Sequence, residues 1–246
     1  MGILRFVYRF ILFWIWTAIM AIYGIILGGR SWPAIKRLTI AAKIWTSGIA
    51  KILGLHIKVF GDTSKCNGLI ISNHMSYVDV FLLGAIFPLR YTPRSDIKYW
   101  PVLGQALWVS RPIWINRSTK QSAGQALDEI TESLRNKINI IAFPEGTTGS
   151  GEGDLLPFKS TVFEAAVEED VPVHPVLIHY KNDENIRISW YGNDTLFGHA
   201  WNLLKAKKIE AEVHILPAIY ANGKNRKELA KNAYIVMNSR YRELYG

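Results

Sequence analysis

The sequence predicts an α/β fold: a mixed, largely parallel β-sheet flanked by helices on both faces, preceded by an N-terminal helical segment. From residue 56 onward, short apolar runs typical of buried strands alternate with longer segments of helical periodicity. The first 60 residues have a different composition, with long apolar stretches and no acidic side chain. We therefore expect two units, an N-terminal helical unit at 1–60 and a second domain at 61–246.

Two helices are expected in the first unit. Residues 10–29 include no charged side chain, and a helix of that length covers about 30 Å, the thickness of the hydrocarbon core of a bilayer. Residues 33–53 start with a proline and interleave apolar and basic side chains at helical spacing, which is typical of an amphipathic helix in a membrane interface. A secretory signal peptide is the alternative for 10–29. The length of the run and the poor cleavage site that follows favour a retained membrane segment.

Positive charge is concentrated in the same unit. Residues 1–61 carry eight basic and no acidic side chains, in a chain of formal net charge +9. Because their neighbours are mostly Trp, Ile, Leu and Phe, we interpret the segment as a contact with anionic lipid and not with nucleic acid. More basic residues follow the run 10–29 than precede it, so a spanning helix would leave the rest of the chain in the cytoplasm. Whether the run spans the bilayer or folds back stays open. The single cysteine, Cys66, excludes an intrachain disulfide and fits a reducing compartment.

The elements of the second domain follow from apolar pattern and from Gly and Pro positions. Strands are expected at 56–61, 68–73, 106–118, 138–146, 171–180, 186–192 and 210–219. Helices are expected at 77–88, 120–137, 160–170 and 226–244. The helix at 120–137 has a clear apolar face, as expected of a helix that packs on a sheet.

A histidine and a carboxylate stand together in an apolar context. His74 directly follows the strand expected at 68–73, and Asp79 lies five positions later in the next helix. Residues five apart in one helix face different directions, so the two side chains meet only if His74 precedes the helix. The carboxylate would then fix the imidazole tautomer and leave the second ring nitrogen free to accept a proton. A capped turn without chemical role is the alternative.

Two further stretches carry candidate binding residues. Glu145, Gly146, Thr147 and Thr148 follow an apolar run, and small residues let backbone N–H groups approach an oxyanion or a phosphate. Arg117 ends the run "WINR", and a guanidinium suits two-pronged phosphate binding. A tight turn with a surface carboxylate and a surface salt bridge are the respective alternatives.

Taken together, the motifs resemble those of the glycerolipid acyltransferase family, the lysophosphatidate acyltransferases in particular. Four blocks match in order, N-H-x-x-x-x-D at 73–79, W-I-N-R at 114–117, F-P-E-G-T at 143–147 and V-P-V-H-P-V at 171–176. The segments 154–166 and 190–201 also resemble bacterial members. Thr148 departs from the family pattern, in which arginine commonly follows F-P-E-G-T, so the head group of the acceptor stays open.

The resemblance implies transfer of a fatty acyl group from acyl-coenzyme A or acyl carrier protein to the free hydroxyl of 1-acylglycerol-3-phosphate, which forms phosphatidate for phospholipid synthesis. It makes His74 the general base and Asp79 the residue that orients it. No acyl-enzyme is expected, because the sequence has no G-x-S-x-G nucleophile elbow. Residues 61–246 then form the acyltransferase domain, which we expect on the cytoplasmic side of a bacterial inner membrane, with residues 1–60 as its anchor.

The same resemblance assigns binding roles. Arg117 would hold the acceptor phosphate, and Glu145 would organise Arg117 or bond a glycerol hydroxyl. Backbone N–H groups at 146–148 would stabilise the oxyanion. Arg94 and Lys159 are further candidates for phosphate or carrier contacts. No metal or redox cofactor is implied. Two alternatives stay open, an acyltransferase that acts on lyso-ornithine lipid or another lysophospholipid, and a non-catalytic lipid-binding membrane protein.

Overall fold

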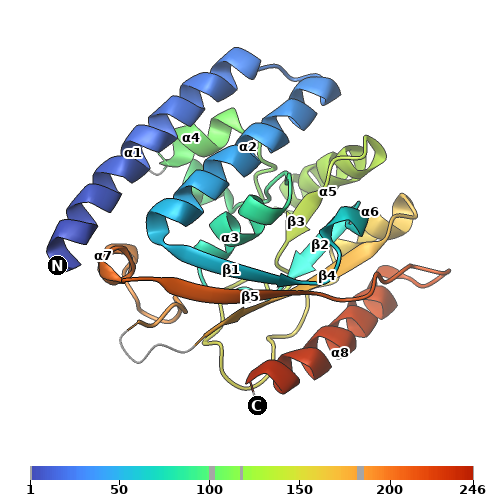
Figure 1. The fold of residues 1–246 in the computed structure, drawn as a ribbon. Coiled ribbons are helices and arrows are strands. Elements are labelled where there is room, and N and C mark those ends of the chain that lie inside the picture. Colours follow the sequence, from blue (N-terminus) through green and yellow to red (C-terminus); the bar gives the residue numbers. More distant parts are fainter. Residues whose placement is uncertain (1, 100–102, 117–118, 182–185, 246) are drawn as a thin grey trace.

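The computed structural model describes residues 2–99, 103–116, 119–181 and 186–245 (Figure 1). Within these residues a five-stranded sheet has the order β1-β5-β4-β2-β3. The strands are β1 (Leu55–Phe60), β2 (Leu69–Ser72), β3 (Ile140–Ala142), β4 (Val173–Tyr180) and β5 (Ile209–Ile215). Strand β1 runs parallel to β5, and β2 runs parallel to both β3 and β4, whereas β4 and β5 are antiparallel. The prediction of a mixed, largely parallel sheet is confirmed.

Helices cover both faces of the sheet (Figure 1). On one face lie α3 (Val78–Ile86) and α7 (Leu196–Lys205), and on the other lie α5 (Lys120–Arg135), α6 (Phe163–Glu168) and α8 (Arg226–Tyr245). Side chains of β2 alternate between the two apolar clusters, with Ile70 in the first and Leu69 and Ile71 in the second. All four residues of β2 are buried, as expected of a parallel strand covered on both faces.

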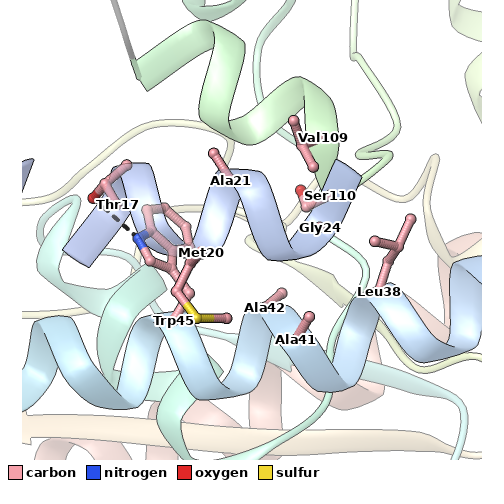
Figure 2. A pocket seen from close by; sticks show the side chains of 10 residues that line it. All are labelled: Thr17, Met20, Ala21, Gly24, Leu38, Ala41, Ala42, Trp45, Val109 and Ser110. Atoms are coloured by element: carbon pink, nitrogen blue, oxygen red, sulfur yellow. Dashed lines mark hydrogen bonds between the residues drawn. The ribbon is translucent and has the colours of Figure 1, made fainter. Parts of the chain in front are cut away.

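The N-terminal unit consists of α1 (Gly2–Leu27) and α2 (Trp32–Leu53), which lie side by side (Figure 1). Trp45 Nε1 donates to Thr17 Oγ1 at 3.1 Å, and Trp16 Nε1 donates to the carbonyl of Trp45 at 2.9 Å. The C-terminal half of α1 also contacts α4 (Leu103–Val109), where a Cβ on Gly24 would lie 2.5 Å from Val109 Cγ1. A cavity of only about 30 Å³ remains between the three helices (Figure 2).

The first turns of α1 are attached to α7. Arg9 is 4% exposed and its guanidinium donates to the carbonyls of Ala206 at 2.7 Å and Leu204 at 3.3 Å. Arg5 donates to the carbonyl of Lys205 at 2.8 Å. These carbonyls end α7 and have no partner within their own helix, so the two cations cap it and stabilise its negative dipole end. Helix α1 is therefore fixed to the rest of the molecule near both of its ends.

Several predicted elements differ from the structure. The strand expected at 106–118 is wrong, because its first part is helix α4, packed against α1, and its second part is extended chain that forms one isolated bridge between Ile115 and Arg94. The segment 186–192, where a strand was expected, belongs to no named strand. Helix α7 was not expected, although Thr195 Oγ1 caps its Gly198 N–H at 3.2 Å. Short 3-10 helices at Thr63–Lys65 and Ser95–Tyr99 complete the order.

Candidate active site

The side chains of His74 and Asp79 meet, as the spacing requires. Strand β2 ends at Ser72 and α3 begins at Val78, so His74 lies in the turn between them. His74 Nδ1 lies 2.8 Å from Asp79 Oδ2. Among the described residues nothing bonds His74 Nε2, and the side chain of His74 is 20% exposed. The pair thus presents one ring nitrogen that is available to a substrate.

The carboxylate of Asp79 is fully buried and fully bonded. Its Oδ2 also accepts the backbone N–H groups of Met75 at 2.7 Å and Ser76 at 2.9 Å. Its Oδ1 accepts the hydroxyl of Tyr180 at 2.7 Å. A buried carboxylate without partners would cost several kcal/mol, and these four bonds offset that cost. Tyr180 was missed by the sequence analysis, since it lies 101 residues away and its pairing depends on strand order.

Asn73 joins the end of β2 to β4. Its Oδ1 accepts the N–H of Ile178 at 2.8 Å, and its Nδ2 donates to the carbonyl of Ile178 at 3.0 Å. The backbone ladder between these strands ends at Ser72 and Val176, so the side-chain amide replaces the next pair of backbone bonds. The backbone of His74 is thereby released from the sheet.

Glu145 and Gly149 hold this released backbone. Glu145 is 6% exposed, and its Oε1 accepts the N–H of His74 at 2.8 Å while its Oε2 accepts the N–H of Leu156 at 2.9 Å. The carbonyl of His74 accepts the N–H of Gly149 at 2.8 Å. Desolvation raises the pKa of Glu145 to about 7, although its two backbone hydrogen bonds and the nearby His74 act in the opposite direction.

The ring of His74 is also held by stacking. It lies on the ring of Phe143, with centroids 4.0 Å apart and planes inclined by 16°. Phe143 and Glu145 therefore fix the ring and the backbone of His74 respectively. Both oxygens of Glu145 accept backbone N–H groups. The contact expected with Arg117 or a glycerol hydroxyl lies outside the described residues and stays a prediction.

The remaining expected residues are distributed as follows. Gly146 has φ +77° and its N–H donates to the carbonyl of Phe143 at 3.0 Å. The side chain of Lys159 lies over Gly146, with Nζ 2.6 Å from the position that a Cβ would take. Thr147 is exposed and Thr148 is half-buried. Arg94 is mostly exposed and pairs with Asp96, which raises the pKa of its guanidinium. Arg117 lies outside the described residues.

A cavity of about 60 Å³ adjoins His74. Its wall is formed by Glu145, the loop 149–156, and Tyr241 of α8. Arg242 of α8 holds this loop through a two-pronged contact with Asp154, at 2.5 and 2.7 Å. Arg242, with a smaller contribution from Asn238, lowers the pKa of Asp154 to about 2. The described residues contain no group of three or more His, Cys, Asp or Glu side chains arranged to hold a metal ion.

The chain is similar to known acyltransferases. A family model described as Acyltransferase matches residues 56–179. A lyso-ornithine lipid O-acyltransferase of Pseudomonas aeruginosa is 30% identical over 203 residues, which cover 82% of this chain and 77% of that protein. A 1-acyl-sn-glycerol-3-phosphate acyltransferase of Neisseria gonorrhoeae is 31% identical over 150 residues, covering 60% and 58% respectively.

A solved structure extends the comparison to the fold. The crystal structure of the 1-acyl-sn-glycerophosphate (LPA) acyltransferase PlsC of Thermotoga maritima aligns with a TM-score of 0.69 at 20% identity, over 99% of this chain and 98% of that one. At that identity the match concerns the fold alone. The family match over the segment that carries His74 and Asp79, together with the sequence relatives, identifies the chain as a member of the acyltransferase family, an enzyme of the lysophosphatidate and lyso-ornithine lipid acyltransferase type.

Proposed function

We propose that this enzyme transfers a fatty acyl group from an acyl-coenzyme A or acyl carrier protein thioester to the free hydroxyl of 1-acylglycerol-3-phosphate, forming phosphatidate. The observation that carries the proposal is the pairing of His74 Nδ1 with Asp79 Oδ2 at 2.8 Å, with Nε2 left for a substrate beside a cavity. A buried carboxylate on one ring nitrogen makes the other nitrogen a suitable general base.

The reaction then proceeds by direct transfer. His74 Nε2 removes the proton of the acceptor hydroxyl while the hydroxyl oxygen attacks the thioester carbonyl. Asp79 stabilises the imidazolium that forms. Collapse of the tetrahedral oxyanion breaks the C–S bond, and the imidazolium returns the proton to the leaving thiolate. We assign oxyanion stabilisation to the backbone N–H groups of Thr147 and Thr148, which bond no acceptor among the described residues. The N–H of Gly146 is not assigned this role, since it bonds Phe143.

The acceptor phosphate requires cations near the cavity. We propose Lys159, which lies over Gly146 in the loop after β3, and Arg117 for this contact. Arg94 is a candidate for the carrier of the acyl donor, since its exposed charge is shared with Asp96. Glu145 acts on the substrate indirectly, through the backbone of His74.

A second acceptor is favoured by one specific observation. The relative from Pseudomonas aeruginosa, similar over 77% of its length, is named lyso-ornithine lipid O-acyltransferase. An ornithine head group carries a carboxylate and an ammonium in place of the phosphate, so the two acceptors place different demands on Lys159 and Arg117. The same His74 and Asp79 chemistry would serve either acceptor.

The enzyme associates with membranes, and we propose that residues 1–60 anchor it and that residues 61–246 form the catalytic domain. Within the described residues, α1 is the one helix long and apolar enough to cross a bilayer. Its outer face exposes large apolar side chains, among them Ile3, Leu4, Ile11, Ile22, Ile25 and Ile26. The opposite face is attached to α7, α2 and α4. We therefore propose that α1 lies in the interface of one leaflet, on the cytoplasmic side of the inner membrane.

The test is thiol release by purified protein in detergent. Palmitoyl-coenzyme A and palmitoyl acyl carrier protein are each offered with lysophosphatidate, lyso-ornithine lipid or no acceptor, beside the variant His74→Ala. We expect release that requires lysophosphatidate and is lost in the variant. Release with lyso-ornithine lipid alone would move the proposal to that acceptor. Equal release in both proteins would remove His74 from the role of base.

A further inference from the structure

The fully buried carboxylate of Asp79 has two differently occupied oxygens. Oδ2 serves His74 and two backbone N–H groups of the same turn, whereas Oδ1 bonds Tyr180, its single hydrogen-bond partner among the described residues. The three bonds to Oδ2 arise within residues 74–79. The bond to Oδ1 comes from Tyr180, the last residue of β4, which is distant from Asp79 in the sequence. This bond therefore forms only when the sheet is assembled.

The fold gives Tyr180 little freedom. Asn73 bonds both backbone groups of Ile178, and residues two apart in a strand face the same side, which directs Tyr180 toward α3 and Asp79. The N–H of Tyr180 donates to the hydroxyl of Tyr245 in α8 at 3.1 Å. Tyr180 itself is 3% exposed. Burial, and then the charge of Asp79, raise the pKa of Tyr180 well above its usual value, so its hydroxyl stays a donor at working pH.

We propose that Tyr180 is a positioning residue of the catalytic pair: its hydroxyl holds Oδ1, and thereby keeps Oδ2 of Asp79 directed at His74 Nδ1. This inference rests on the proposed role of the pair. The bond has two consequences. It fixes the carboxylate plane, and it draws negative charge toward Oδ1, which moderates the stabilisation that Asp79 gives to the imidazolium of His74.

The Tyr180 hydroxyl also affects how the activity depends on pH. The titratable groups around Asp79 are His74, Tyr180 of β4, Glu145 after β3, and Tyr241 and Tyr245 of α8. The hydrogen bonds to Asp79 come from His74, Tyr180 and backbone groups, and the two α8 tyrosines act on it only through space. Removal of the Tyr180 hydroxyl leaves more charge on Oδ2, so the imidazolium of His74 forms more readily. The acid limb of the kcat/KM profile then moves to higher pH.

The test compares Tyr180→Phe with Tyr91→Phe in the full-length protein, using whichever acceptor supports His74-dependent thiol release. Tyr91 is a matched control, because it is buried in the same apolar cluster and its hydroxyl faces Gly84 of α3 and not the pair. In Tyr180→Phe we expect the pH-independent kcat to fall about tenfold, in line with the loss of one bond to a charged group. We also expect KM to stay within about twofold, and the acid limb to rise by about half a pH unit. Tyr91→Phe should match the wild type in all three.

A second variant tests the inference even if the Tyr180→Phe protein does not fold. A fluorinated tyrosine incorporated at position 180 keeps the shape and strengthens the donor, so the acid limb should move to lower pH. Profiles that superimpose on the wild type in both variants would overturn the inference. If instead the wild type itself shows no His74-dependent transfer, the proposed function has failed, which is a separate outcome.

Discussion

At the residue scale, the site depends on three side chains that contact His74 from different sides. Glu145 holds its backbone, Phe143 its ring face and Asp79 its Nδ1. Of these groups Glu145 has the least favourable environment, since desolvation outweighs its two hydrogen bonds and raises its pKa to about 7. A carboxylate in that state makes the stability of the fold sensitive to pH.

Glu145 makes the folded state less stable as pH rises. The pKa of Glu145 is about 7 in the folded protein and close to the ordinary value of 4.5 in the unfolded chain. Between these values the folded state retains a proton that the unfolded state has released. Stability therefore falls as pH rises through this window, by on the order of 3 kcal/mol. Glu145→Gln should lack this component, measured as the urea midpoint at pH 5 and pH 8. The exposed Glu243→Gln is the control, and identical pH dependence in all three proteins would contradict the prediction.

A second residue-scale prediction concerns the clamp between β2 and β4. Asn73→Asp keeps the acceptor for the Ile178 N–H but replaces the donor to its carbonyl with a second acceptor. The buried carbonyl of Ile178 then faces a carboxylate oxygen, which costs about 1–3 kcal/mol. We expect a lower melting temperature and a lower kcat, because both His74 and Tyr180 depend on this junction. Unchanged kcat in a folded Asn73→Asp protein would show that the clamp does not position the pair.

At the element scale, the attachment of α1 to α7 is one of the contacts that join α1 to the rest of the molecule. Arg9 makes several bonds to the carbonyls that end α7, while Arg5 makes one. Because Arg9 is also buried, its loss leaves several carbonyls without partners. Helix α1 has contacts with α2 and α4 besides, so we expect local loosening of its N-terminal half and not its release.

Arg9→Met should accordingly destabilise the protein by about 2–3 kcal/mol, as expected for lost bonds to a charged group. Arg5→Met is the matched control and should cost less than half as much. Hydrogen exchange at 2–12 and at 203–207 is the sharper measurement, since these two segments should lose protection together. Equal effects of the two substitutions would contradict the assignment of Arg9 as the principal cap.

At the scale of the whole molecule, the question is how α1 meets the bilayer. A helix of 26 residues is long enough to span, yet its inner face is committed to α7, α2 and α4. Spanning would require these contacts to lie inside the hydrocarbon together with the capped end of α7. An interfacial position keeps the sheet and the cavity at His74 on the same side as the water-soluble acyl donor.

Labelling of single cysteines decides between the two positions. In a Cys66→Ser background, Gly2→Cys and Arg30→Cys mark the two ends of α1, and Lys207→Cys marks the catalytic domain. Cys66 is the single cysteine of the chain, so its replacement leaves only the introduced thiol to react. With an impermeant maleimide on sealed inverted membrane vesicles, we expect all three sites to react from the same side. Protection of Gly2→Cys until detergent is added would show that α1 spans.

The sequence allowed the contact between His74 and Asp79 to be predicted because all of its determinants are local. A strand end, a turn and a helix start within residues 68–79 suffice to bring His74 and Asp79 together. The partners of Glu145 and the contact of Tyr180 could not be predicted in this way, since both depend on which strands become neighbours. The resemblance in four sequence blocks suggested a role for these segments, but it did not indicate which hydrogen bonds their residues form.

Local pattern failed where tertiary contacts decide the structure. The short apolar runs at 107–109 and 113–115 are typical of strands, yet the contact between Val109 and Gly24 of α1 favours a helix at 103–109. Helix α7 was missed because the apolar side chains of Phe197 and Trp201 lie outside the face that buries Leu203, so the segment shows no single apolar stripe. Phe197 is 72% exposed, whereas Trp201 lies 4.1 Å from the ring of Phe6 in α1.

The release of His74 from the sheet by Asn73 has a consequence for how such an enzyme can diversify. The chemistry that we propose uses one short segment, residues 73–79, and most of the cavity wall is contributed by the loop 149–156 and by α8. Changes in that loop can therefore alter which head group is admitted without moving the proton-transfer machinery. Exchange of loop 149–156 between relatives with different acceptors is an economical route to new lipid products, and the reaction itself would be inherited unchanged.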